Sequence, residues 1–238
     1  MVVINQSRKI MILGDSGSGK TTLLKYLIDN FSKKWTCYIY NTDYEIFKMN
    51  DKIKPIKPDY DKTDNMEYLS EIITTLRAKK NNFVFAITDL DRFYDKSSVL
   101  SNKNEAIKDL YGTGRHQRIL TIAETKQPRY IPSKLLANTN LFYISKFTEL
   151  EDVKRLRNYA NTKTLLSLKK YEFLEVDKWN MQSRIITLSN NEIKVIKNIN
   201  NPITDNTDNT ETTETTEREV KNYSRYQEYL KGDRENDN

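Results

Sequence analysis

The segment that most restricts the fold of this chain is Gly14-Asp-Ser-Gly-Ser-Gly-Lys-Thr21, which matches the pattern G-x-x-x-x-G-K-[ST] in full. An apolar segment typical of a short buried strand, residues 8–13, precedes it. Apolar residues with helical spacing follow it to about Phe31. This order of strand, loop and helix is the context in which the pattern forms a phosphate-binding loop. Three of the six glycines of the chain lie in this segment, which argues against a chance flexible loop.

Each residue type in this segment suits the binding of a nucleotide phosphate. The glycines allow successive backbone N–H groups to turn inward around phosphate oxygens, and the following helix directs its positive end toward the same charge. The Lys20 ammonium can reach the β- and γ-phosphates, and the Thr21 hydroxyl can ligate Mg²⁺. We therefore expect ATP and Mg²⁺ as cofactors, with the nucleotide held by Gly14, Asp15, Ser16, Gly17, Ser18, Gly19, Lys20, Thr21 and Thr22.

A second apolar segment, residues 83–87, leads into Thr88-Asp89-Leu90-Asp91 and predicts a buried strand beside the phosphate loop with acids at its end. Such acids order the waters around Mg²⁺ or activate the attacking water. Two assignments are open. In the first, Asp89 serves the metal and Asp91 approaches the water; in the second, Thr88 stands at the metal position and Asp89 is the catalytic acid. We favour the first because Asp89 carries a charge, although Asp91 also suits a helix cap.

A third polar group surrounds the apolar segment 118–123. Gln127 follows this segment and is suited to hydrogen-bond the attacking water or the γ-phosphate. Arg115 precedes it within a Gly-Thr-Gly-Arg turn, and its permanently charged planar group suits a phosphate on a neighbouring subunit or on DNA. Arg118 and Arg129 are alternatives for the same role. The predicted catalytic residues are therefore Lys20, Asp89, Asp91, Gln127 and Arg115.

The order of these motifs over residues 8–190 resembles the FtsK–HerA superfamily of DNA-pumping ATPases, and more closely the small packaging ATPases of viruses with double-stranded DNA. The resemblance implies an oligomeric, ring-forming ATPase that translocates double-stranded DNA into a viral capsid. An arginine from the neighbouring subunit would then complete the ATP site, and a capsid or membrane-vertex protein would be a partner. In that family an acid usually follows the metal-binding acid directly, whereas this chain has Leu90 there.

Strand and helix patterns alternate along the chain and predict an α/β fold, namely a mostly parallel sheet flanked by helices of the P-loop (RecA-like, ASCE) type. The charged stretch around Pro55 and Pro58 reads as a loop. We expect a further loop through Pro128 and Pro132. The remaining expected elements are strands at 35–40, 118–123 and 141–146, helices at 65–79, 103–111 and 149–159, and a C-terminal β-hairpin made of 164–175 and 183–188.

Charge and composition divide the chain into an ATPase domain, residues 1–200, and a low-complexity acidic tail, residues 201–238, which we expect to be disordered. The tail carries ten acidic and five basic side chains, which leaves residues 1–200 with a net charge of +11. A basic domain suits a polyanionic partner, although the lysine-rich composition of an AT-rich genome would explain it equally well. No apolar run is long enough to span a membrane, and the single Cys37 fits a reducing compartment. We expect the host cytoplasm, or association with the virion.

Three other functions fit parts of the same pattern. A replication-type ATPase, either an initiator or a helicase loader, would normally add a helical lid or a DNA-reading domain. A small-molecule kinase or GTP switch would carry an arginine-rich lid or an Asn-Lys-x-Asp element, and neither is present in the sequence. A nucleotide-dependent regulatory protein would bind ATP without turnover, and Leu90 is compatible with that function.

Overall fold

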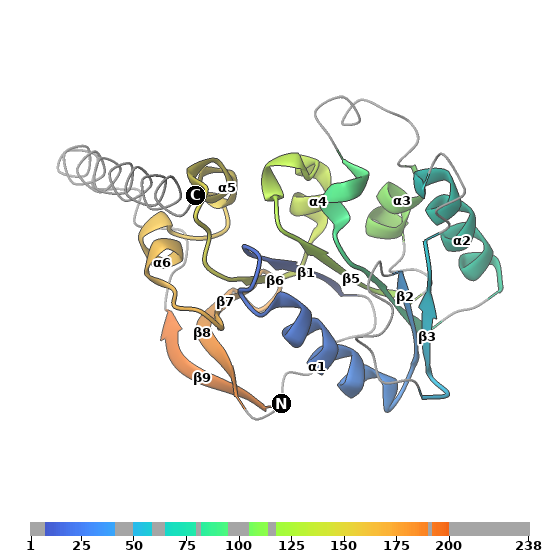
Figure 1. Ribbon diagram of the computed structural model, residues 1–238, viewed down its shortest axis with the longest axis horizontal. Helices are drawn as coiled ribbons and strands as arrows, with labels where there is room; N and C mark the ends of the chain where they lie inside the picture. The colour runs from blue at the N-terminus through green and yellow to red at the C-terminus, as the bar shows by residue number, and fades with distance from the viewer. Residues whose placement is uncertain are drawn as a thin grey trace, which may run out of the picture. The chain divides into compact units, whose positions relative to one another are not determined.

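The computed structural model describes residues 8–40, 50–58, 65–79, 82–94, 105–113, 118–189 and 192–199, all within one compact unit, Met1–Pro202. These residues form a nine-stranded sheet in the order β3-β2-β4-β5-β1-β6-β7-β8-β9 (Figure 1). The strands are β1 (Lys9–Leu13), β2 (Thr36–Tyr40), β3 (Ile53–Ile56), β4 (Phe83–Ile87), β5 (Leu120–Thr125), β6 (Leu141–Ile144), β7 (Glu172–Asp177), β8 (Gln182–Ser189) and β9 (Glu192–Ile199).

The helices divide unequally between the two faces of the sheet (Figure 1). One apolar cluster joins the sheet to α1 (Lys20–Ser32) through Leu23, Leu24, Leu27 and Ile28. The other cluster, on the opposite face, collects the apolar side chains of the remaining helices. These are α2 (Asn65–Lys79), α3 (Glu105–Thr113), α4 (Ser133–Asn138), α5 (Leu150–Leu156) and α6 (Thr162–Ser167), with two short 3₁₀ helices, η2 (Leu90–Phe93) and η6 (Pro128–Tyr130).

The sheet consists of a parallel part, β1 to β6, and an antiparallel part, β7 to β9. The predicted α/β class with a mostly parallel, helix-flanked sheet is therefore confirmed. Strand β4 does not lie directly beside β1. Strand β5 pairs with both of them and separates the strand that ends before Asp89 from the strand that leads into the phosphate loop.

Several predicted segments need correction. Pro55 lies in β3, not in a loop; β3 is an edge strand, where proline is tolerated because its missing N–H faces away from the ladder. Residues 164–167 are helical and not part of a strand, since they belong to α6, which Asn161 caps by accepting a hydrogen bond from the Lys163 backbone N–H. The segment after Pro132 forms α4. Strand β9 was not predicted, because its exposed side chains give no clear alternation of apolar and polar residues.

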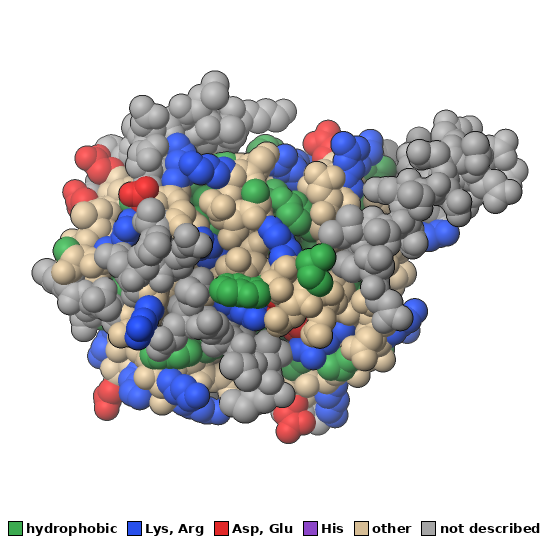
Figure 2. All heavy atoms as spheres, turned by 180° about the vertical axis from the view of Figure 1, so that it is seen from behind, with side chains coloured by type: hydrophobic (Ala, Val, Ile, Leu, Met, Phe, Trp, Pro, Cys, Tyr) green, Lys and Arg blue, Asp and Glu red, His purple; other side chains and the backbone are tan. Residues whose placement is uncertain are grey.

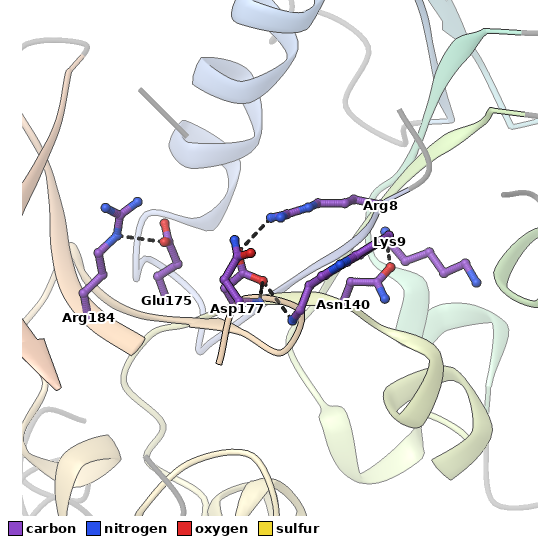
Figure 3. A network of polar contacts seen from close by, with 8 residues as sticks. Arg8, Lys9, Asn140, Glu175, Asp177 and Arg184 are labelled. Atoms are coloured by element: carbon purple, nitrogen blue, oxygen red, sulfur yellow. Dashed lines mark hydrogen bonds and ion pairs between the residues drawn. The ribbon is translucent and has the colours of Figure 1, made fainter. Parts of the chain in front are cut away.

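A buried ion pair lies where the parallel and antiparallel parts of the sheet meet (Figure 3). Arg8, directly before β1, donates to the carboxylate of Asp177 at the end of β7 over 2.8 Å, and both side chains are 6% exposed. The same carboxylate accepts hydrogen bonds from the backbone N–H groups of Trp179 and Asn180, which fixes the turn into β8. The pair thus connects segments that are 169 positions apart in the sequence.

Two sequence predictions, the role of Arg115 and the nature of residues 201–238, lie outside the described residues. Within the described ranges, none of the helices combines the length and the apolar character that crossing a membrane requires.

Candidate nucleotide-binding site

The predicted phosphate loop occupies the turn between β1 and α1, and its glycines adopt backbone angles that suit this residue. Gly14, Gly17 and Gly19 have φ values of 156°, 72° and 97°, in the region that side chains with a Cβ atom disfavour. A Cβ atom at Gly14 would lie 2.8 Å from the Ser145 Cβ at the end of β6, so the loop also needs glycine for close packing.

The loop is held in place by its own residues and by the segment after β6. The Asp15 carboxylate accepts hydrogen bonds from the backbone N–H and the hydroxyl of Thr148, both at 2.6 Å. The Asp15 backbone N–H donates to the Lys146 carbonyl, and the Asp15 carbonyl accepts a hydrogen bond from the Lys20 ammonium at 2.7 Å. Of the nine residues predicted to bind nucleotide, Asp15 and Lys20 therefore also hold the loop in shape, through hydrogen bonds to each other and from Asp15 to the segment after β6.

The start of α1 faces this loop. Gly19 caps the helix without a side-chain hydrogen bond, and no acidic residue lies in the first turn. Ser16 and Thr22 are exposed, and the buried Ser18 hydroxyl has no hydrogen-bond partner among the described residues. An uncapped helix start with free backbone N–H groups is an anion-binding arrangement, so the loop suits a phosphate group.

The structure adds Glu124, which was not predicted, to this site. Glu124 lies in β5 opposite Ile12 of β1, and its carboxylate accepts a hydrogen bond from the Thr21 hydroxyl at 3.1 Å. Leu120 and Ile122 of the same strand pack on the α1 side of the sheet, and alternation places Glu124 on that side as well. The predicted strand ended at residue 123; an acidic residue in an otherwise apolar strand was the signal that could have revealed Glu124.

Burial shifts the titration of both charged groups at the start of α1. Burial lowers the pKa of Lys20, an effect opposed mainly by the nearby carboxylate of Glu124. Burial raises the pKa of Glu124, which is only 3% exposed, and the Lys20 ammonium and the Thr21 hydrogen bond oppose that shift. The two groups stabilise each other's charged forms inside the protein.

Asp89 follows β4 and carries the second carboxylate of the site. Its backbone is left-handed, with φ 48°, and the residue is 9% exposed. Its two oxygens lie 3.0 Å from the Lys126 ammonium and 3.3 Å from the Arg92 guanidinium. Lys126, which sequence reasoning did not single out, also acts electrostatically on Lys20 and Glu124. Lys20, Glu124, Asp89 and Lys126 therefore form one cluster of alternating charge.

The residues around Asp89 have other partners. The Thr88 hydroxyl donates to the Tyr40 carbonyl at 3.4 Å, and the Leu90 side chain is fully buried in the cluster on the face opposite α1. The Asp91 carboxylate accepts hydrogen bonds from the Thr125 hydroxyl at 2.6 Å and from the Lys126 backbone N–H at 3.0 Å. These contacts give Asp91 a role in holding the end of β5, and its predicted role toward the attacking water stays a prediction.

Gln127 and the arginines occupy different surroundings. Gln127 is half-buried and is the cap residue directly before η6. Its backbone N–H donates to the Thr125 hydroxyl at 3.3 Å. The Arg129 guanidinium lies 3.7 Å from three carboxylates at the start of α5, those of Glu149, Glu151 and Asp152. Arg129 is thereby engaged within its own chain. Arg118 is exposed directly before β5.

The residues at the start of α1 fit a Mg²⁺ ion that arrives with a nucleotide. The Thr21 hydroxyl and the Asp89 carboxylate are oxygen donors of the kind that Mg²⁺ prefers. In addition, the second carboxylate oxygen of Glu124 is buried and has no hydrogen-bond partner among the described residues. A buried oxygen without a partner is costly unless a ligand, ion or water satisfies it, which supports a hydrated cation here.

Comparison with known families gives one match that spans most of the chain. The family model described as Poxvirus A32 protein matches residues 2–231. None of the curated protein sequences matches the chain.

Comparison with solved structures identifies the same fold in viral and bacterial proteins. The genome packaging NTPase B204 from Sulfolobus turreted icosahedral virus 2, in complex with ATP-gammaS, has a TM-score of 0.64 at 17% identity, over 76% of this chain and 98% of that chain. The DNA-packaging ATPase B204 from Sulfolobus turreted icosahedral virus has a TM-score of 0.65 at 19% identity, with the same coverage. The pCW3 conjugation coupling protein TcpA has a TM-score of 0.55 at 17% identity, over 72% and 57% of the two chains.

Proposed function

The chain belongs to the Poxvirus A32 protein family, and on that premise we propose that it is an ATP-hydrolysing motor that packages double-stranded DNA into a viral capsid. The observation that carries this proposal is the phosphate loop at the uncapped start of α1, facing the buried Glu124 and the Asp89–Lys126 pair. The titles of the similar solved structures support it, because they name a genome packaging NTPase and a DNA-packaging ATPase.

In the proposed reaction, the loop N–H groups and the start of α1 bind the phosphates of ATP. The Lys20 ammonium exchanges its hydrogen bond with the Asp15 carbonyl for the β- and γ-phosphates. Thr21 and Asp89 would hold Mg²⁺, which would neutralise phosphate charge. Lys126 pairs with Asp89, and Gln127 directly precedes η6; we propose that they pass the state of the γ-phosphate on to η6. Of the catalytic residues predicted from sequence, Lys20, Asp89 and Gln127 keep the proposed roles. Asp91 holds the end of β5, and its role toward the attacking water stays a prediction.

We propose that the protein acts as a homo-oligomeric ring in which Arg115 of the neighbouring subunit completes the site, because Arg129 is engaged by acids of its own chain. Lys and Arg side chains are more widespread than Asp and Glu on the face shown in Figure 2. A backbone-binding motor needs this kind of surface, because it contacts phosphates without reading sequence. A capsid or membrane-vertex protein is the proposed docking partner, in the host cytoplasm or the virion. Residues 201–238 are proposed to form an acidic tail outside the ATPase domain.

The test is steady-state ATP hydrolysis with and without double-stranded DNA, for the full chain and for Lys20→Ala. Lys25→Ala is the control, because it removes a lysine from the same helix away from the loop. We expect double-stranded DNA to stimulate turnover several-fold in the wild type and in the control, and we expect Lys20→Ala to hydrolyse no ATP above background. Nucleotide binding without turnover, or turnover that ignores DNA, would contradict the motor and favour a regulatory protein.

A further inference from the structure

We propose that Glu124 is the carboxylate that positions Thr21 for Mg²⁺ and accepts a hydrogen bond from the water shell of the ion. This inference rests on the proposed nucleotide site, and it is independent of whether the protein moves DNA. It gives a role to an acid within β5, the strand that Gln127 follows.

The first step is the contact between Glu124 and Thr21. A hydroxyl that ligates a cation does so through an oxygen lone pair, so its hydrogen must point elsewhere. The Thr21 hydroxyl donates that hydrogen to Glu124 at 3.1 Å. Partners of this kind fix the orientation of metal ligands, and their loss typically weakens metal affinity by about 10–100-fold.

The second step is the free oxygen of the same carboxylate. It is buried, and no hydrogen bond reaches it within the part of the chain that the structure describes. The cluster contains a second carboxylate, Asp89, and two ammonium groups, Lys20 and Lys126. Bound Mg²⁺ usually keeps several waters, and a buried carboxylate oxygen next to a ligating hydroxyl is a suitable acceptor for one of them.

The third step compares the position of Glu124 with that of Leu90, the residue that stands where an acid was expected after Asp89. At the end of β4 the residue after Asp89 packs into the apolar core on the far side of the sheet, so it offers no second acid. Strand β5 lies between β4 and β1 and brings Glu124 to the α1 side. The second carboxylate near the metal therefore comes from a different strand.

The experiment compares the affinity for a non-hydrolysable ATP analogue in Mg²⁺ and in EDTA, by calorimetry on the full chain. In the wild type, Mg²⁺ tightens binding. In Glu124→Gln we expect this tightening to fall by about tenfold or more. We expect binding in EDTA to stay equal or to become tighter, because a negative charge near the phosphates is removed. General damage to the fold would weaken binding in both conditions.

Glu175→Gln is the matched control, since Glu175 is also buried, on β7, and its carboxylate pairs with Arg184 and not with Thr21 (Figure 3). It should keep the Mg²⁺ effect of the wild type. Glu124→Asp is a second test that keeps the charge but shortens the reach to Thr21, and it should also reduce the Mg²⁺ effect. The double variant Glu124→Gln with Thr21→Ala should reduce the Mg²⁺ effect by less than the product of the two single reductions. The reason is that Glu124 acts through the Thr21 hydroxyl, so both changes remove the same metal ligand.

Equal Mg²⁺ effects in the wild type, Glu124→Gln and Glu124→Asp would overturn this proposal. An analogue affinity that ignores Mg²⁺ in the wild type would overturn the role of Glu124 and the Mg²⁺ site, whereas no binding of the analogue at all would overturn the nucleotide site. An ATPase that needs Glu124 for its Mg²⁺ effect but ignores DNA would overturn only the packaging motor.

Discussion

Leu90 shows how one side chain separates an expected site from the observed one. Its place after Asp89 is where the resemblance seen in the sequence predicts an acid, yet its side chain is fully buried among apolar neighbours. The backbone of Asp89 is left-handed, and the two neighbouring side chains point in different directions. The Asp89 carboxylate lies near Lys126, and the Leu90 side chain enters the core. Leu90 is therefore a core residue.

Replacing Leu90 by alanine tests this assignment. We expect Leu90→Ala to lower the free energy of unfolding by about 2–5 kcal/mol, because a large buried side chain leaves a cavity. Urea unfolding followed by circular dichroism measures the change. Leu76→Ala, at a half-buried position of α2, is the control and should cost clearly less. A loss below about 1 kcal/mol for Leu90→Ala would contradict the buried position.

At the scale of elements, the junction between the phosphate loop and α1 depends on Gly19. This residue caps α1 with φ 97°, and a Cβ atom there would lie 2.8 Å from a ring carbon of Tyr171. Tyr171 precedes β7, has a left-handed backbone with φ 67° and is 48% exposed. The antiparallel part of the sheet thus contacts the loop through an aromatic ring.

Gly19→Ala should therefore be more damaging than Gly17→Ala. Both changes place a Cβ atom on a left-handed backbone, which costs about 1–2 kcal/mol. Only Gly19→Ala adds a steric conflict, because a Cβ atom at Gly17 meets no atom within 4 Å. Calorimetric affinity for a non-hydrolysable ATP analogue should fall by more than tenfold for Gly19→Ala and by less for Gly17→Ala. Adding Tyr171→Ala to Gly19→Ala should recover part of the loss; no recovery would contradict the role of the ring.

At the scale of the whole molecule, the two parts of the sheet depend on the buried Arg8–Asp177 pair. Removing one member of such a pair leaves the other charge buried without compensation, which typically costs about 3–5 kcal/mol. We expect Asp177→Ala to lower the free energy of unfolding by this amount, as measured by urea unfolding. Glu149→Ala is the control, because Glu149 is 60% exposed and lies 3.7 Å from Arg129. Similar losses in both variants would contradict the importance of the junction.

Much of this architecture follows from local patterns in the sequence. The bounds predicted for the helix at 65–79 agree with α2, and the strand before Gly14 and the helix after it lie where the apolar spacing put them. Such segments are predictable because their own periodicity sets which face is buried. The loop residues followed from a motif in which each residue type has its own chemical reason.

The parts that could not be predicted depend on neighbours distant in sequence. Lys126 became a site residue only because β5 inserts between β1 and β4 and brings it to Asp89. Glu124 was missed for the same reason and because the strand was ended two residues too early. Pro55 was assigned to a loop from its local preference, yet pairing with β2 at the sheet edge overrides that preference. Strand order is set by packing between elements, which single-sequence patterns do not record.

The hydrogen bonds around Asp15 have a consequence for how strongly a nucleotide can be bound. The loop is tethered to Thr148 and Lys146, and its own Lys20 closes it, so hydrogen bonds within the protein hold its backbone. The loss of conformational entropy has therefore already occurred during folding. A phosphate that enters such a preorganised cradle need not order it again, so more of the interaction energy remains as affinity.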